Sequence, residues 1–419
     1  MPDFILSNPI KTGAQRVPYQ YAWLSENESC DVAIVGGGVS AALCAYYFAK
    51  SHIKTVLVTS KPVGYGKSCA FTSQFQYECF PNLSQVIKKA GKDQAVSLFK
   101  LGMEGLNNIE ELCSELADDC GCQKRDCFYY THDEEHYDDI YAEYLMRRHL
   151  GCDVEFLDKK TARDRFSFPL EAGVYMKNAA CDIDNYLFTQ ELIHEASLRG
   201  CRVYENTAVE EISSFDDHVV LNTSTGRSVT ANKVILSTGF SLSHYLGLPV
   251  VSRTAFMVAT KPVPDYTGWE NRCIIRDIDR PYNQFKTTAD SRIIASRIEN
   301  LFVKTDGRIS KLMPAKRVFQ NQYAQMTERL NEMFPAITGI RPEFEYAGRF
   351  VETRDLLPYV GEHENYGNVY FNLCTGSSAA LLSEQSARLL LDLYQNKPNE
   401  NRAVFSPQKR SGGKSAAAR

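Results

Sequence analysis

Residues 31–61 constrain the fold of this chain more than any other stretch, because they carry the pattern of a strand, a glycine-rich turn, a helix and a second strand. Residues 31–35 form a short apolar run typical of a buried parallel strand, and the motif GGGVSA at 36–41 follows directly. Residues 39–51 then favour a helix, and 54–59 favour a second buried strand. The pattern predicts a nucleotide-binding βαβ unit.

The small residues of this turn suit it to a dinucleotide. Gly36 permits the tight turn, Gly38 lets the backbone approach a pyrophosphate, and Ala41 is small enough for the helix to pack on the strand. At Val39 and Ser40 the helix begins, and its N–H groups and positive dipole end attract phosphates. The alternative is a glycine-rich turn of an α/β sheet that binds no ligand.

The end of the second strand departs from the usual dinucleotide pattern. An Asp or Glu normally binds the ribose hydroxyls there, but this chain has Thr59, Ser60 and Lys61. A serine hydroxyl still hydrogen-bonds a ribose, although more weakly than a carboxylate does. We therefore expect a dinucleotide to bind, with less affinity from this position.

The composition excludes several classes of function. A chain of 419 residues permits two domains or one elaborated domain. Its formal net charge of −4 provides no basic field for nucleic acid, and no stretch has the apolar length of a membrane span. The first residues lack the basic start and apolar run of a secretory signal, and thirteen scattered cysteines are an odd number. We expect a soluble cytoplasmic protein with free thiols.

A metal site is the alternative interpretation of one cysteine-rich segment. Cys113, Cys120, Cys122 and Cys127 lie close together in the sequence, with two histidines following in an acidic, tyrosine-rich run. The spacing lacks the paired CxxC units of a structural zinc site, so ordinary thiols are favoured and no metal is expected.

Three later segments offer contacts to a flat ligand. Residues 64–78 are rich in small and hydroxyl side chains, which either donate hydrogen bonds to a ligand or form a solvated loop. Residues 232–240 read as a buried strand ending in Ser-Thr-Gly, where the backbone can approach a ligand. Residues 368–394 repeat the order of strand, small-residue turn and helix.

Taken in order, these pieces resemble the D-amino-acid oxidase and glycine oxidase superfamily of FAD-dependent oxidoreductases. The resemblance covers most of the chain and rests on ordered matches rather than on one glycine motif. The matching segments are 31–41, 66–78, 233–239, 280–292, 348–361 and 368–380.

The resemblance implies an α/β fold in which a Rossmann-like FAD-binding domain is combined with a discontinuous second domain built on an antiparallel sheet. The expected FAD-binding domain comprises 28–80, 150–240 and 345–395. The remaining expected parts are a helical segment at 81–149, a substrate domain at 241–344, an N-terminal arm at 1–27 and a flexible tail at 396–419.

The resemblance also implies the chemistry. Noncovalently bound FAD oxidises the C–N bond of a small-molecule amine, a hydride equivalent passes to flavin N5, and the imine then hydrolyses in water. No acid–base triad is required. The residues that the pattern and the resemblance assign to FAD are Gly36, Gly38, Val39, Ser40, Ala41, Ser60, Lys61, Lys67, Ser68, Thr72, Ser73, Gln76, Val209, Thr238, Gly239, Gly376, Ser377, Ser378 and Ala379.

Two departures from the family pattern concern the substrate. Amino-acid-oxidising members clamp the substrate carboxylate with an arginine, and the matching position here is Phe350, with Arg349 displaced by one residue. A second family arginine is matched by Ser377. A simple α-amino acid is therefore not the expected substrate. The candidates for the substrate pocket are Tyr282, Lys286, Arg297, Arg349, Phe350 and Glu352.

Three hypotheses follow from these departures. The first is an amine oxidase or dehydrogenase acting on an amine that is not a simple α-amino acid. The second is an oxidase of N-substituted or D-amino acids, with the carboxylate held by Arg349 or Lys286. The third is a flavin-binding protein without turnover.

Overall fold

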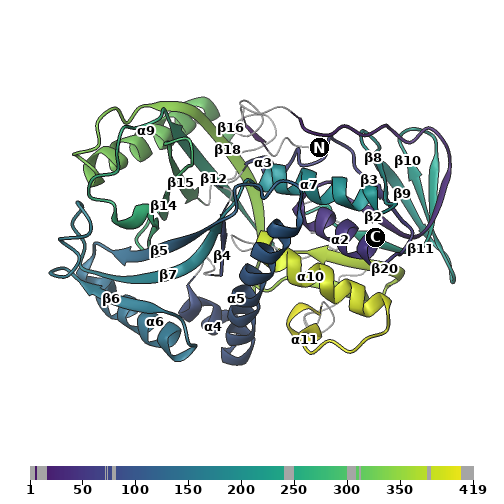
Figure 1. Cartoon of the computed structure of the whole chain (residues 1–419), viewed down its shortest axis with the longest axis horizontal. Coiled ribbons are helices and arrows are strands. Elements are labelled where there is room, and N and C mark those ends of the chain that lie inside the picture. Colours follow the sequence, from purple (N-terminus) through teal and green to yellow (C-terminus); the bar gives the residue numbers. More distant parts are fainter. Residues whose placement is uncertain are drawn as a thin grey trace.

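The computed structural model describes residues 5–6, 17–70, 72, 74–77, 82–239, 250–299, 308–310, 313–374 and 379–406. Within these residues the chain forms two large sheets, one on each side of the molecule, with helices between and around them (Figure 1). The α/β fold class expected from the sequence is confirmed.

The eight-stranded sheet contains the predicted βαβ unit. Its main path runs in the order β19-β20-β11-β2-β3-β8, in which β19 is antiparallel to β20 and the other neighbours are parallel. A ribbon of β9 and β10 extends from β11. The strands are β2 (Glu28–Val35), β3 (Thr55–Val58), β8 (Arg202–Tyr204), β9 (Val209–Ser214), β10 (Val219–Thr223), β11 (Ser228–Leu236), β19 (Tyr359–His363) and β20 (Tyr366–Leu373).

Both faces of this sheet are buried, as its uninterrupted apolar strands predict. Val32 and Ile34 pack in a core with the helices, whereas Ala33 and Val35 pack on the other face with the ribbon strands. The helices of this part are α2 (Val39–Lys50), α7 (Asn185–Leu198), α10 (Ala379–Tyr394) and α11 (Arg402–Phe405).

The ten-stranded sheet forms the other side of the molecule. Its main path runs in the order β1-β18-β12-β15-β14-β13-β5-β7-β4, and β6 pairs with β7. The strands are β1 (Ile5–Leu6), β4 (Gln74–Gln76), β5 (Gln123–Thr131), β6 (Val154–Asp158), β7 (Ala172–Asp182), β12 (Val250–Thr260), β13 (Ile274–Asp277), β14 (Asn283–Thr287), β15 (Ile293–Glu299) and β18 (Pro342–Thr353). A separate pair is formed by β16 (Arg308–Ser310) and β17 (Met313–Pro314).

Helices cover the ten-stranded sheet on both faces. Helix α9 (Ala315–Met333) packs through Met326 and Leu330 on Phe256 and Phe285 of one face. The other face is approached by α3 (Lys67–Ala70), α4 (Leu83–Ala90), α5 (Lys92–Glu115) and α6 (Tyr137–His149), with short 3-10 turns at Glu134–His136 and Glu270–Arg272.

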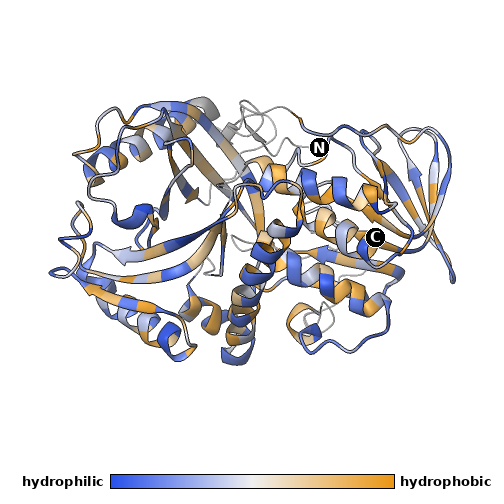
Figure 2. Ribbon diagram, viewed as in Figure 1, coloured by the Kyte–Doolittle hydropathy of each residue, from blue (hydrophilic) through white to orange (hydrophobic). Residues whose placement is uncertain are grey.

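Helices α5 and α10 join the two parts of the molecule. Figure 2 shows hydrophobic and hydrophilic residues along both helices, and most of α10 is buried. Gly105 of α5 lies so close to α10 that a Cβ atom there would be 3.2 Å from the carbonyl oxygen of Leu381. The backbones of α5 and α10 are therefore in close contact at this point.

The structure corrects several sequence-based boundaries. The first part of the helical segment expected at 81–149 is two helices, because Gly91 adopts φ 87 between α4 and α5. The same expected helical segment also contains the strand β5, whose second half is buried. Strands β6, β7 and most of β18, assigned to the FAD-binding domain, belong instead to the ten-stranded sheet, where antiparallel partners satisfy their backbone groups.

Both chain ends are also more structured than expected. In the expected irregular arm, Ile5 pairs with Gly348 of β18. In the expected tail, Val404 and Phe405 of α11 are buried. Among the described residues, no helix is long and apolar enough to cross a membrane, and no group of three or more His, Cys, Asp or Glu side chains is arranged to hold a metal ion.

Candidate flavin and substrate site

The glycine turn after β2 is shaped by two very close backbone approaches. Gly36 adopts φ 138, and a Cβ atom there would lie 2.3 Å from the carbonyl oxygen of Ser237. At Gly37 a Cβ atom would lie 2.5 Å from Oγ1 of Thr59. At Gly38 the nearest atom would be Oγ of Ser68, at an ordinary 3.5 Å. Packing within the protein thus requires the first two glycines, whereas the third leaves room for a ligand.

The N-terminus of α2 is open to such a ligand. Its N-cap residue Gly38 provides no side chain to bind the first N–H groups. The N–H of Val39 donates to the hydroxyl oxygen of Ser68 at 3.0 Å, and Ser68 is buried on the short helix α3. The predicted residues Ser40 and Ala41 occupy the same first turn of α2. The geometry places Val39 and Ser68 together, as the sequence suggested.

The end of β11 contains a buried hydroxyl group that lacks a partner among the described residues. The N–H of Ser237 donates to the carbonyl of Val35 at 2.9 Å, but its Oγ is buried and makes no hydrogen bond. Leaving such a group unsatisfied costs about 1–3 kcal/mol. The predicted Thr238 and Gly239 follow it, half-buried and exposed respectively, and Gly239 adopts φ 59. This orphaned hydroxyl next to Gly36 fits a site that a bound polar ligand completes.

The end of β3 has no carboxylate available for a ribose. Oγ1 of Thr59 donates to the carbonyl of Lys61 at 3.0 Å, and both Ser60 and Lys61 are exposed. The buried carboxylate on the neighbouring strand end is Glu205, whose oxygens accept the N–H groups of Val63 at 2.6 Å and of Tyr21 at 3.2 Å. Glu205 therefore fixes the backbone, and ribose binding by Ser60 stays a prediction.

The remaining predicted FAD residues are distributed around this edge. Gln76 bridges strands, because its Oε1 accepts from Gln284 at 3.1 Å and its Nε2 donates to Cys127 Sγ at 3.4 Å. Thr72 is half-buried, Val209 begins β9, and Ala379 begins α10. Lys67 begins α3. Ser73, Gly376, Ser377 and Ser378 lie outside the described residues.

The substrate candidates on β18 point to opposite faces of the ten-stranded sheet. Phe350 is buried in an apolar cluster with Tyr346 of the same strand and Met257 of β12. By the alternation of a strand, Arg349 faces the α9 side with Ala347, and its burial lowers the pKa of the guanidinium. Arg349 and Phe350 therefore do not line one pocket.

Three further candidates are held by specific partners. Lys286 is buried and forms an ion pair with Asp182, and Glu352 is buried and forms an ion pair with Arg253. Arg297 lies on the α9 side, where it donates to Asn283 at 2.8 Å and to amide oxygens of α9. A carboxylate-binding role for Lys286 would compete with the nearby carboxylate, and Arg297 faces away from the Phe350 cluster.

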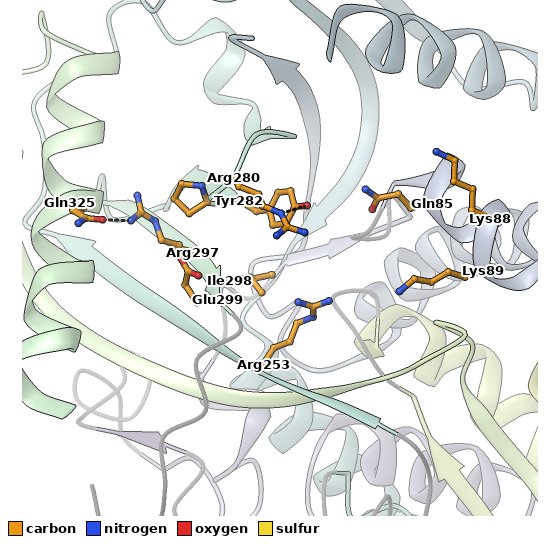
Figure 3. A pocket seen from close by; sticks show the side chains of 11 residues that line it. Gln85, Lys88, Lys89, Arg253, Arg280, Tyr282, Arg297, Ile298, Glu299 and Gln325 are labelled. Carbon is orange, nitrogen blue, oxygen red and sulfur yellow. Dashed lines mark hydrogen bonds between the residues drawn. The ribbon is translucent and has the colours of Figure 1, made fainter. Parts of the chain in front are cut away.

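A cavity of about 610 Å³ opens between α4 and the end of the ten-stranded sheet (Figure 3). Lys88 and Lys89 line it from α4, and Arg253, Arg280 and the predicted Tyr282 line it from the sheet side. The hydroxyl of Tyr282 accepts a hydrogen bond from Nε of Arg280 at 3.3 Å. Sequence reasoning missed these four cations, although Arg280 lay within a family-like segment.

The turn that presents Arg280 and Tyr282 is fixed by a buried carboxyl. Asp277 accepts from the backbone N–H of Asn283 at 2.7 Å and from its side-chain Nδ2 at 2.8 Å. Burial raises the pKa of Asp277 to about 7. Asp279 on the same turn hydrogen-bonds His136 at 2.7 Å and thereby raises the pKa of that histidine.

Comparison with known proteins finds similarity over most of the chain. A family model described as DAO, FAD dependent oxidoreductase, matches residues 31–393. Glycine oxidase of Geobacillus kaustophilus is 25% identical over 390 residues, covering 88% of this chain and 93% of that protein. Its crystal structure superposes with a TM-score of 0.75 at 21% identity, covering 92% of this chain and 100% of that chain.

Two other similar proteins are named for different activities. Gamma-glutamylputrescine oxidoreductase of Escherichia coli strain K12 is 21% identical over 381 residues, covering 89% of this chain and 85% of that protein. The structure of L-amino acid deaminase from Proteus myxofaciens has a TM-score of 0.76 at 13% identity, covering 97% of this chain and 98% of that chain. The shared fold therefore leaves the substrate to be inferred from the residues of the site.

Proposed function

The chain belongs to the family of FAD-dependent oxidoreductases, and from this premise we propose that it oxidises a C–N bond of an amine that is not a simple α-amino acid. FAD is its cofactor, and the open helix N-terminus, the space at Gly38 and the orphaned hydroxyl of Ser237 fit that group. We infer noncovalent binding.

Phe350 is the observation that carries the substrate proposal. The family resemblance matches this position to the arginine that clamps a substrate carboxylate, yet here a buried phenyl ring occupies it within an apolar cluster. A carboxylate placed against that ring would lose its hydration without gaining a cation, which is unfavourable. Arg349 points to the opposite sheet face, so it does not restore the lost charge.

The chain's own residues suit the handling of a neutral amine. Bound FAD supplies a hydride acceptor at N5. Met257, Tyr346 and Phe350 form a water-poor surface, on which an amine is favoured in its uncharged, reactive form. Positioning the substrate carbon against the cofactor is then the main task of this face. The released imine hydrolyses in water.

Anaerobic flavin reduction tests the proposal. Purified holoenzyme is mixed without oxygen with a panel of amines, polyamines and amino acids, and the loss of flavin absorbance is followed. We expect amines to bleach the flavin and glycine or D-alanine to leave it oxidised. Rapid bleaching by a simple α-amino acid contradicts the proposal. Failure of every compound in the panel to bleach the flavin also contradicts it.

A substitution at the key position sharpens the test. Phe350→Arg is expected to create detectable reduction by small α-amino acids, because it restores a bidentate carboxylate partner. Phe350→Leu is the matched control, since it keeps the site apolar, and is expected to keep the original preference. An arginine variant that folds and binds FAD but shows no change in ligand preference counts against the assigned position.

An N-substituted or D-amino acid is the second candidate substrate class, and one observation favours it. Arg253 of β12 is the cross-strand partner of Phe350 in the sheet register. A cation is therefore present on the strand next to Phe350, although Arg253 is itself paired with Glu352. The two ligands first considered for this carboxylate, Arg349 and Lys286, are less suitable because of their orientation and ion pair.

A further inference from the structure

We propose that the cavity between α4 and the β13–β14 turn binds an anionic oxygen group of the substrate, distant from the reacting C–N bond. The substrate class is then an amine that carries a carboxylate or phosphate at the end of an apolar stem. The inference rests on the proposed amine oxidation and adds the second recognition element of the same site.

The cavity has a strongly unbalanced charge. Five of its lining residues are cationic and one is acidic. The cations are Lys88, Lys89, Arg253, Arg280 and Arg297, and the acid is Glu299. Like charges gathered around one concave space raise the electrostatic potential within it and attract an anion. Arginine adds planar, bidentate geometry that matches a carboxylate or phosphate.

Three of these cations form no ion pair in the described part of the chain, although Glu299 of the same cavity interacts electrostatically with one of them, Arg280. No acidic side chain there forms an ion pair with Lys88, Lys89 or Arg280. Arg253 differs, because it is paired with Glu352. Arg297 is held by amide oxygens, including Gln325 at 2.8 Å. The positive charge that no ion pair among the described residues offsets therefore lies on Lys88, Lys89 and Arg280.

The inner wall of the cavity leads toward the proposed reaction surface. Arg253 and Phe350 are register partners on adjacent antiparallel strands, so their side chains lie on the same face of the sheet. Tyr282 precedes β14 and lies two residues before Gln284, so both side chains point to the same face of the sheet. Gln284 hydrogen-bonds Gln76, one of the residues predicted to contact FAD. An anion held in the cavity can thus extend an apolar stem toward the Phe350 cluster.

The two lysines alone have a simpler explanation. Lys88 and Lys89 lie in the last turn of α4, where the negative end of the helix dipole favours cations. That explanation does not account for Arg280 and Arg253, which face the same cavity from the sheet (Figure 3). It also predicts a change in helix stability rather than a change in anion binding, so the two explanations are separable.

Calorimetric titration of the holoenzyme tests the cavity without requiring turnover. The probes are glutarate, inorganic phosphate and butyrate, a monoanion that differs from glutarate by the loss of one carboxylate. We expect glutarate or phosphate to bind more tightly than butyrate and to weaken as salt is raised. Binding by glutarate alone assigns a carboxylate, and binding by phosphate alone assigns a phosphate ester. Absence of binding by both overturns the inference.

Charge-matched variants locate the binding. In Lys88→Gln/Lys89→Gln, dianion affinity is expected to fall by roughly fivefold, as two exposed charge contacts imply. The control Lys54→Gln/Lys100→Gln removes two exposed lysines that do not line the cavity and is expected to retain affinity. Equal losses in both double variants, or no loss in the first, contradict the assignment.

Flavin reduction separates this inference from the proposed function. Propylamine and 4-aminobutyrate differ by the carboxylate, and the anionic amine is expected to reduce the flavin at lower concentration in the parent but not in Lys88→Gln/Lys89→Gln. Equal flavin reduction by both amines in both proteins contradicts the anion site but supports amine oxidation. Glutarate binding without flavin reduction by any amine supports the anion site but contradicts amine oxidation.

Discussion

The cofactor edge of the eight-stranded sheet and the substrate face of the ten-stranded sheet differ in what determines them. At the cofactor edge, main-chain approaches at Gly36 and Gly37 set the shape, and any side chain there would collide with Ser237 or Thr59. At the face where we propose that the substrate binds, single side chains such as Phe350 and Arg253 set the chemistry. Backbone approaches thus shape the glycine turn, whereas in this proposal side-chain identity selects the substrate.

Gly36→Ala is expected to have the largest effect of the single changes. The added Cβ would meet the Ser237 carbonyl at 2.3 Å in a backbone conformation that favours glycine. Overpacking and strain together predict a loss of about 4 kcal/mol in the free energy of unfolding. Urea denaturation of the apoprotein measures it, with Gly367→Ala as the control, where the nearest atom would be 3.8 Å away.

Gly38→Ala tests whether the third glycine of the turn, unlike Gly36, serves the cofactor instead of packing. Its Cβ meets only Ser68 Oγ at 3.5 Å, so the apoprotein is expected to keep its stability within about 1 kcal/mol while FAD affinity falls about tenfold. Fluorescence titration with FAD gives the affinity. Loss of apoprotein stability without loss of FAD affinity would show that Gly38 serves packing instead of the cofactor.

Lys286→Met tests whether this lysine of the ten-stranded sheet stabilises the fold instead of binding the substrate. The change leaves the carboxylate of Asp182 without its buried cationic partner, although Arg125 remains at 3.4 Å. We expect a loss of about 3 kcal/mol in the free energy of unfolding, as for one half of a buried ion pair. Lys159→Met, in the more exposed pair with Glu171, is the control and is expected to cost less than about 1 kcal/mol.

If Lys286→Met lowers the free energy of unfolding by less than about 1 kcal/mol, the result contradicts the structural function that the ion pair indicates. Lys286 would then again be a candidate for binding the substrate. Chemical denaturation of both methionine variants, carried out side by side at one salt concentration, gives the decisive difference.

Asp277→Asn tests an effect that depends on pH. The folded pKa of Asp277 is about 7 against an ordinary 3.8, so the native state retains a proton that the unfolded chain releases between these values. This contribution to stability is present at low pH and is lost as pH rises from about 4 to about 7, at no more than about 1.4 kcal/mol per unit.

The asparagine variant is expected to lose this component of the pH dependence. Denaturation from pH 4 to 8 measures the slope, and Asp265→Asn at an exposed position is the control. An identical slope in the parent and the Asp277→Asn protein contradicts protonation of the buried carboxyl.

Sequence reasoning predicted the cofactor edge because its signals are local. The apolar strand, the glycines and the helix start follow one another within a dozen residues, so Gly36, Gly38 and Val39 were identified directly. Gly37 was missed because its constraint comes from Thr59 on another strand. The orphaned hydroxyl of Ser237 was likewise invisible, since burial and the lack of a partner are tertiary properties.

The substrate side was less predictable for the same physical reason. Lys286 was a reasonable candidate until its ion pair with Asp182, more than a hundred residues away in sequence, became visible. The cationic cavity combines α4 with β12 and the β13–β14 turn, which no local pattern connects. Strand β5 was missed because cysteines and charges surround its aromatic core residues Phe128 and Tyr130.

The double pairing of β18 has a consequence for how such a protein can evolve. A shift of one residue in this strand would exchange the faces of Arg349 and Phe350 and so return a cation to the reaction surface. However, Gly348 pairs with Ile5 on one side and Ala255 on the other, which fixes the register at this point. Insertions or deletions in β18 are therefore disfavoured, and point substitution at position 350 is the accessible way to change the side chain on the face where we propose that the substrate binds.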